Sequence, residues 1–171
     1  MDVRANVRLG QLNAKNVIKE HSLLEPPINV VKLAKELGYQ VHKANFKNEN
    51  ISGAVKFTNN DDNKGVIYLK WTDASLRKRF TLAHEIGHCI MHRKKYPAGL
   101  MESINMFRNP ENHSPEEIQA NAFAAELLMP SDMVKAMWDK WGSTEILADI
   151  FKVSLSAMSY RLYNLNLKGD W

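Results

Sequence analysis

The sequence predicts an α+β fold, a mainly helical single domain with a small β-sheet of about three strands in its N-terminal half. The first observation is size and composition: 171 residues, 44% hydrophobic and 25% charged, suit one domain with a core. The second is that apolar residues recur at helical spacing along most of the chain. The third is a group of three strand-like segments before residue 71, with no repeat or flexible linker dividing the chain.

The N-terminal half is expected to contain two helices followed by the strands. Residues 4–20 form a modestly amphipathic helix, and a second helix begins at its cap Asn29 and ends at Gly38. The strands are Tyr39–Phe46, Ile51–Phe57 and Gly65–Lys70, and an Asn/Asp-rich run before Gly65 makes the last turn.

The C-terminal half is expected to be helical around one long loop. Thr72 or Asp73 caps a helix that runs to about His92, and residues 93–113 lack periodicity and form a loop with at most a helical turn. Ser114 then caps a helix with proline at its first position and acids in its first turn. That helix ends near Met129, and shorter helices follow over 131–141, 144–151 and 155–166.

Composition excludes several classes of protein. No stretch approaches the ~20 apolar residues that span a bilayer, and no apolar run follows the N-terminal charges as in a secretory signal. A single cysteine, Cys89, excludes an internal disulfide and a Cys-rich zinc finger, so we expect a cytoplasmic protein. Residues 1–95 hold 17 Lys/Arg against 9 Asp/Glu, whereas residues 96–171 hold 6 against 10. This basic bias is typical of a solvated face and is weak support for nucleic-acid binding.

The strongest motif is His84-Glu85-Ile86-Gly87-His88, an HExxH pattern inside a predicted helix. At 100° per residue the two histidines lie about 40° apart on the helix and one turn apart along it, so both imidazoles reach one metal ion. Glu85 lies about 100° round from His84 and reaches a water on that metal rather than the metal itself. The pattern predicts catalytic zinc, with Glu85 as the general base of a peptidase. A separate apolar sector anchors the helix through Leu76, Leu82, Ala83, Ile86 and Ile90.

A catalytic zinc ion needs a third protein ligand, and two nearby candidates fail on helical geometry. Cys89 points about 100° beyond His88, away from the metal. His92 lies about 12 Å along the axis from His84, so it is expected to be a second-shell or packing residue. The sequence also lacks the HExxHxxGxxH form that supplies a third histidine.

The helix that begins at Ser114 offers the best third ligand. Glu117 shares one helical face with the small residues Ala120 and Ala124, which allow close approach to the motif helix. We therefore favour Glu117 over Glu116, which lies about 100° off that face. Another interpretation leaves Glu117 as the capping-box partner of Ser114.

The chain resembles the ImmA/IrrE-like zinc metallopeptidases over about residues 27–165. The resemblance is carried by PI at 27–28, LAKELG at 33–38, SGA at 52–54, RFTLAHEIGH at 79–88 and EIQANAFAAELLMP at 117–130. It implies that the glutamate of the ExxAN segment, Glu117, is the third zinc ligand. Gln119 departs from a common second acid. We thus expect one metallopeptidase domain, 1–171, with an N-terminal helix (1–24), a catalytic core (27–130) and C-terminal helices (131–171).

The resemblance also implies a function. Members of the family act inside bacteria or on mobile elements, where they cleave a helix-turn-helix repressor at one site and switch on genes. The expected partner is therefore a protein substrate rather than a membrane or nucleic acid. The loop 93–113 joins the two ligand-bearing helices, and its apolar residues Leu100, Ile104, Met106 and Phe107 either recognise that substrate or pack the loop.

Two further questions stay open in the sequence. Residues 147–162 resemble a helix-turn-helix DNA reader, which would suit a non-proteolytic metal-binding module that grips a repressor or DNA. Arg161 is the only strong base on the second of those helices and this half is acidic, so packing helices are the better interpretation. The group that stabilises the oxyanion is not fixed by any pattern, and the candidates are His113, Tyr96, Arg79 and Arg161.

Overall fold

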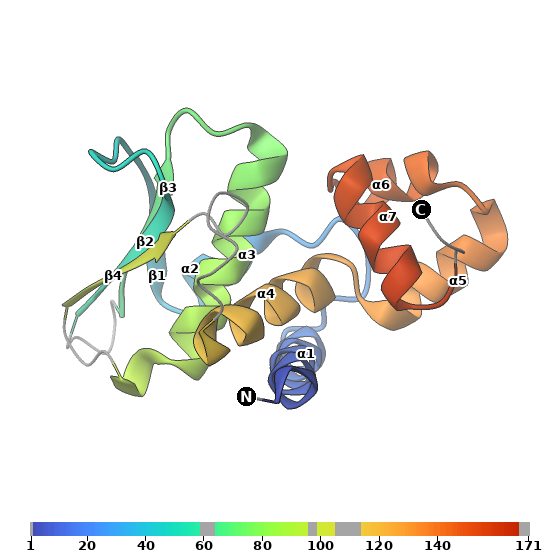
Figure 1. Ribbon diagram of the computed structural model, residues 1–171, viewed down its shortest axis with the longest axis horizontal. Coiled ribbons are helices and arrows are strands. Elements are labelled where there is room, and N and C mark those ends of the chain that lie inside the picture. The colour runs from blue at the N-terminus through green and yellow to red at the C-terminus, as the bar shows by residue number, and fades with distance from the viewer. Residues whose placement is uncertain (1, 59–63, 96–98, 105–113, 168–171) are drawn as a thin grey trace.

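The computed structural model describes residues 2–58, 64–95, 99–104 and 114–167. Over these residues the fold is α+β, as predicted, with a small mixed sheet beside long helices (Figure 1). In Figure 1 the sheet lies on the left, two long helices cross beside it, and the last three helices form a group on the right.

A four-stranded sheet in the order β1-β3-β2-β4 forms one side of the core. Three of its strands are the expected ones: β1 (Tyr39–Ala44), β2 (Ile51–Phe57) and β3 (Gly65–Lys70). β1 runs parallel to β3, and β2 is antiparallel to both β3 and β4.

The fourth strand, β4 (Gly99–Ile104), lies in the segment predicted as a loop. That prediction is wrong over these six residues, although the short 3-10 helix η1 (Arg93–Lys95) is the helical turn it allowed. The sequence GLMESI mixes a glycine and polar residues with apolar ones, so it carries no strand periodicity. Backbone pairing with β2, a tertiary contact, makes it a strand.

Seven helices complete the described part of the chain. They are α1 (Val3–Glu20), α2 (Val30–Glu36), α3 (Ser75–Met91), α4 (Pro115–Leu128), α5 (Ser131–Trp141), α6 (Thr144–Phe151) and α7 (Leu155–Asn164). The side chains of Asn29 and Ser114 cap α2 and α4 as predicted. The cap expected from Thr72 or Asp73 is wrong, because α3 begins after Ala74, which makes no side-chain cap bond.

Two glycines bring the central helices close together. α3 packs against β2 and β3, α4 lies across α3 (Figure 1), and α1 packs against α4. A Cβ at Gly10 of α1 would lie 2.9 Å from the Cβ of Ala122, and one at Gly87 of α3 would lie 3.0 Å from the ring of Phe123. Only glycine permits these approaches, so α1, α3 and α4 form one tightly packed unit.

A buried ion pair ties the C-terminal helices to α4. The Arg161 guanidinium on α7 pairs with Glu126, and its Nε donates to the Met129 carbonyl at 3.0 Å. The backbone N–H and the hydroxyl of Ser131 donate to the other Glu126 oxygen at 3.1 and 2.9 Å. Both carboxylate oxygens are therefore satisfied inside the protein, and the pair fixes α7 against the end of α4.

None of the helices within the described ranges is long and apolar enough to cross a lipid bilayer.

Candidate metal centre

α3 presents the HExxH residues at a buried surface. His84, Glu85 and His88 are at most 6% exposed, and the two histidines stack one turn apart with ring centroids separated by 4.6 Å. Regular helical geometry alone produces this arrangement, because residues four apart occupy the same face. Both imidazole Nε2 atoms point to one place, with 3.0 Å between them.

α4 brings Glu117 to the same place. Its first turn begins at Ser114, whose hydroxyl accepts the backbone N–H of Glu117 at 3.3 Å. The Glu117 carboxylate is then free to reach across, and its oxygens lie 3.2 Å from the Nε2 atoms of His84 and His88. The capping interpretation and the ligand interpretation are thus compatible, since the first uses the backbone of Glu117 and the second its side chain.

The donor set fits a zinc ion. Two imidazole nitrogens and one carboxylate are the usual three-ligand set of a catalytic zinc site. The ligand atoms of tetrahedral zinc, bound at about 2.0–2.1 Å, lie about 3.3 Å from one another. The separations of 3.0 and 3.2 Å between the donors of His84, His88 and Glu117 are close to this value.

The electrostatics of these groups favour a positive charge at this point. Burial opposes charge on Glu117, but its contacts with the two histidines outweigh this effect and hold the pKa of the carboxyl well below its usual range. Burial, reinforced by the neighbouring imidazoles, lowers the pKa of His88 to about 4, so this ring is neutral at pH 7. Burial also opposes charge on His84, yet contacts with Glu117 and Glu85 raise its pKa. A positive charge is thus favoured where the carboxylates meet the rings.

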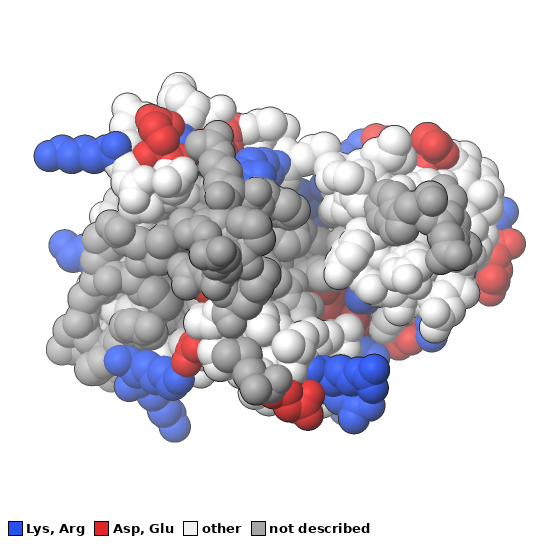
Figure 2. All heavy atoms as spheres, in the orientation of Figure 1, with Lys and Arg blue, Asp and Glu red and all other residues white. Residues whose placement is uncertain are grey.

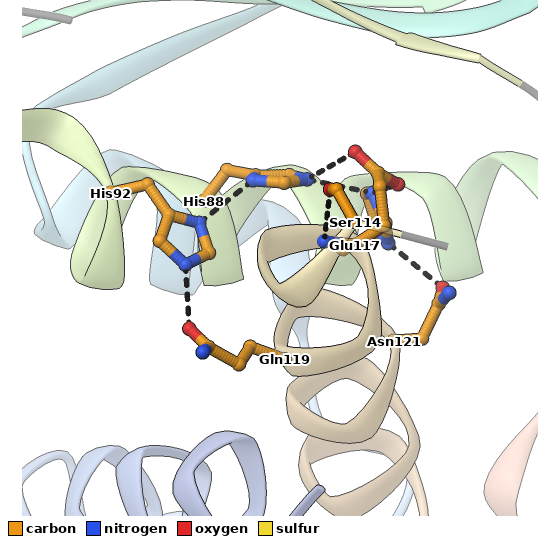
Figure 3. A network of polar contacts seen from close by, with 7 residues as sticks. His88, His92, Ser114, Glu117, Gln119 and Asn121 are labelled. Carbon is orange, nitrogen blue, oxygen red and sulfur yellow. Dashed lines mark hydrogen bonds and ion pairs between the residues drawn. The ribbon is translucent and has the colours of Figure 1, made fainter. Parts of the chain in front are cut away.

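Each histidine is also held from its far side (Figure 3). The Nδ1 of His84 lies 2.9 Å from the amide oxygen of Asn121 on α4. The Nδ1 of His88 lies 2.9 Å from the Nδ1 of His92, which follows the last residue of α3. Hydrogen bonds of this kind orient imidazoles in proteins that bind a metal through histidine. His92 is therefore not among the converging donors, and it contacts His88 instead, in line with the expectation from its spacing.

Glu85 lies between α3 and the sheet. It is fully buried, and β2 passes directly beside it at Gly53. A Cβ at Gly53 would meet the Glu85 carboxylate and lie 2.7 Å from Cγ2 of Thr81. The carboxylate is close enough to His84 to raise the pKa of that ring. It therefore sits beside the converging donors without being one of them, as a general base requires.

The other candidate ligands and those candidate oxyanion groups that the structure describes do not join the converging donors. Cys89 is buried away from the converging donors, and burial raises the pKa of its thiol. Glu116 instead pairs with Lys95 at the surface. Arg161 is occupied by Glu126, which makes it an unsuitable oxyanion group. Arg79 keeps two buried guanidinium nitrogens without hydrogen-bond partners in the described ranges, and burial lowers its pKa.

Several predictions fall on residues outside the described part of the chain. The oxyanion candidates Tyr96 and His113 and the recognition residues Met106 and Phe107 are in this group. Sequence reasoning gave no role to Asn121, Gln119, Gly53 or Asn6, although the first three stand in or beside the blocks that carry the family resemblance.

The chain is similar to known proteins in sequence and in fold. Residues 34–163, more than half of the chain, match the model of a peptidase family, the IrrE N-terminal-like domain. The radiation response metalloprotease IrrE of Deinococcus radiodurans is 32% identical over 107 residues, which are 61% of this chain and 32% of that protein. The match therefore spans about a third of the length of that relative.

A solved structure shares the fold. A Mycobacterium tuberculosis transcriptional regulator superposes with a TM-score of 0.60 over 95% of this chain and 52% of that one. Its sequence identity is 13%, so the likeness concerns the fold alone.

Proposed function

The chain belongs to the IrrE N-terminal-like family of metallopeptidases, and from that premise we propose that it is a zinc-dependent endopeptidase with its ion held by His84, His88 and Glu117. The observation that carries the proposal is the convergence of two imidazole nitrogens and one carboxylate at 3.0 and 3.2 Å. When bound, zinc supplies a Lewis acid and lowers the pKa of water to about 7.

Glu85 supplies the proton transfer. Its carboxylate takes a proton from the attacking water and delivers it to the leaving amine when the peptide bond breaks. Burial between α3 and β2 fixes its position, since Gly53 and Thr81 leave the side chain little room. A structural zinc site is closed by four protein ligands and has no use for such a base, which favours hydrolysis over a purely structural metal site.

The proposed substrate is a helix-turn-helix transcriptional repressor, cut at one site in the cytoplasm of a bacterium during a stress response or for a mobile element. The family resemblance supports this choice, and the IrrE relative is a radiation response protein. We expect a narrow range of substrates and slow or absent digestion of unstructured casein.

The alternative to a peptidase is a non-proteolytic metal-binding module that binds a repressor or DNA. Its weakness is the chemistry of α7, whose exposed large side chains are Leu155, Tyr160 and Tyr163, while Arg161 is buried. Figure 2 shows charges of both signs scattered over the C-terminal helices on the face drawn, rather than a continuous basic surface. Phosphate contacts dominate DNA affinity, so this surface suits DNA poorly.

The decisive experiment combines metal analysis with cleavage. The purified protein should hold one zinc per chain, lose it on chelation, and cut a candidate repressor encoded by a neighbouring gene, with fragments identified by mass spectrometry. Both His88→Ala and Glu117→Ala should lower the metal content and abolish cleavage. Unchanged zinc in both variants would contradict the ligand assignment. Repressor binding without any cleavage by the zinc-loaded protein would favour the non-proteolytic alternative.

A further inference from the structure

A chain of hydrogen bonds runs from His88 to the first helix of the protein. His88 contacts His92 through their Nδ1 atoms at 2.9 Å, and the Nε2 of His92 lies 2.9 Å from Oε1 of Gln119 on α4 (Figure 3). Nε2 of Gln119 donates to Oδ1 of Asn6 on α1 at 2.6 Å. Nδ2 of Asn6 donates to the backbone carbonyl of Asp2 at 3.0 Å. Four side chains thus connect the proposed metal centre to the backbone of α1.

The backbone carbonyl of Asp2, at the far end of this series, fixes which atoms of Asn6 and Gln119 donate and which accept. A backbone carbonyl only accepts hydrogen bonds, so Asn6 must turn its NH₂ group toward Asp2 and its oxygen toward Gln119. That oxygen accepts, so Gln119 must present its NH₂ group to Asn6. The Gln119 oxygen is then left facing His92. Each amide is oriented by the group before it, and neither can flip without placing two donors or two acceptors together.

The same matching of donors to acceptors determines which ring nitrogens of His92 and His88 carry protons. The Gln119 oxygen requires a proton on Nε2 of His92, and a neutral imidazole then has a bare Nδ1 that accepts. The facing Nδ1 of His88 must therefore carry the proton and donate it. His88 is left with an unprotonated Nε2, the atom that lies 3.0 Å from Nε2 of His84 and 3.2 Å from Glu117. In the metal-free protein a proton on Nε2 of His84 supports this state, whereas the Glu117 carboxylate, itself an acceptor, opposes it.

We propose that Gln119, oriented by Asn6, and His92 are positioning residues that fix the tautomer of His88 so that its Nε2 lone pair faces the metal. The inference deepens the proposed function and rests on it for the identity of the ion. It assigns a role to α1, which lies outside the residues that match the family model. His84 needs no such chain, because Asn121 contacts its Nδ1 directly.

Burial makes this arrangement effective. His88 and His92 are 2 and 3% exposed, so water has little access to replace a lost partner. A neutral histidine free to choose its tautomer would spend part of its time with a proton on Nε2, where it cannot bind a metal. Losing an outer-shell partner of this kind typically lowers metal affinity about 10–100-fold.

The tautomer can be read directly in the metal-free protein. Two-bond ¹H–¹⁵N correlation spectra of histidine-labelled protein should show His88 as the Nδ1–H form in the wild type. The variant Gln119→Leu, which removes both hydrogen bonds of this side chain, should give a mixture of the two forms. A wild-type His88 with its proton on Nε2, or an unchanged Gln119→Leu spectrum, would overturn the proposal.

Two substitutions at residue 6 test the donor-to-acceptor direction of this series of hydrogen bonds. Asn6→Asp keeps an oxygen toward Gln119 and should leave the His88 tautomer as it is. Asn6→Lys offers only a donor, so Gln119 should turn its amide over, His92 should become a donor at Nδ1, and His88 should carry its proton on Nε2. Asn13→Lys is the matched control, because Asn13 also lies on α1 and bonds the carbonyl four residues before it. Equal spectra for Asn6→Lys and Asn13→Lys would refute the directional mechanism.

Zinc affinity, measured by competition with a chelator, separates this inference from the proposed function. Gln119→Leu and Asn6→Lys should bind Zn²⁺ about 10–100-fold more weakly than the wild type. Gln40→Leu is the matched control, since Gln40 contacts His42 at the exposed surface of β1, and its affinity should not change. If the wild type binds no Zn²⁺, the proposed function fails while the spectra still decide the tautomer. If it binds and Gln119→Leu binds equally well, the inference alone fails.

Discussion

Gly53 on β2 lies directly against the carboxylate of Glu85 on α3, with no room for a side chain between them. A Cβ at this position would meet the carboxylate and stand 2.7 Å from Cγ2 of Thr81. Cγ2 of Thr81 is attached directly to its Cβ, whereas the Glu85 carboxylate ends a longer side chain on the same helix, so the carboxylate is the part that would have to move. The absence of a side chain at residue 53 is therefore part of how Glu85 is positioned.

We expect Gly53→Ala to lower peptidase activity about 10²-fold, as a displacement of a catalytic group by about 1 Å can do. Zinc content should stay at the wild-type level, because the atoms nearest to an added Cβ belong to Glu85 and Thr81 and not to the three proposed ligands. The control is Gly142→Ala, where nothing lies within 4 Å but φ is +56°. That variant should lose about 1 kcal/mol of stability through backbone strain and keep its activity. Full activity in Gly53→Ala would mean that Glu85 tolerates displacement.

Replacing the proposed base should separate metal binding from catalysis. Glu85→Gln keeps the shape of the side chain but cannot accept the proton, so the cleavage rate should fall about 10²–10⁴-fold with zinc still bound. Glu116→Gln makes the same chemical change at a carboxylate that pairs with Lys95, and should leave the rate unchanged. Undiminished cleavage by Glu85→Gln would show that another group activates the water.

The local part of the site follows from the sequence alone. His84 and His88 share a helical face by spacing, and Ala120 and Ala124 mark the face of the next helix that approaches them. Helical periodicity is a short-range property, so it can be inferred without knowing the fold. It also puts Glu117 on the same face as Ala120 and Ala124, and in the structure that face brings the Glu117 carboxylate within 3.2 Å of the two histidines.

The features that the sequence does not predict depend on contacts between residues far apart in the chain. Asn6 meets Gln119 because α1 packs on α4, and β4 is a strand because β2 lies beside it. The sequence does contain one sign of the contact between α1 and α4. Gly10 interrupts a helical pattern at a cost of about 1 kcal/mol relative to alanine, and close approach of another backbone is a usual reason for such a glycine. α4 makes that approach.

The sequence offers Arg161 as a candidate oxyanion group, whereas the structure pairs it with Glu126. On α7 it shares a face with Met158 and Leu162, both of them core residues. A charge on an apolar face requires a buried partner, so this pattern indicates a structural ion pair rather than a catalytic group. The partner, Glu126, lies on a different helix, and sequence periodicity cannot identify it.

Breaking this ion pair should destabilise the protein strongly. Arg161→Leu leaves Glu126 charged and unpaired in the interior, which typically costs about 3–5 kcal/mol in the free energy of unfolding. Urea denaturation measures the loss. The double variant Glu126→Leu/Arg161→Leu should recover part of it, because no isolated charge remains. Lys152→Ala removes one partner of the exposed pair with Asp149 and should change little.

The same variants test the catalytic role of Arg161. At a temperature where Arg161→Leu is still folded, its zinc content and its cleavage rate per folded molecule should match those of the wild type. A large fall in rate with full zinc and intact fold would restore Arg161 as an oxyanion group.

Cys89 should behave as a buried, unreactive thiol. It is 4% exposed, and burial raises its pKa above the ordinary value, so almost none of it is thiolate at pH 8. Because the thiolate is the reactive form, the native protein should be alkylated by iodoacetamide far more slowly than the urea-unfolded chain, and the native rate should rise with pH. Cys89→Ala should keep its zinc, whereas Glu117→Ala should not. Rapid labelling of the folded protein would show that this thiol is accessible, and loss of zinc from Cys89→Ala would place it at the metal.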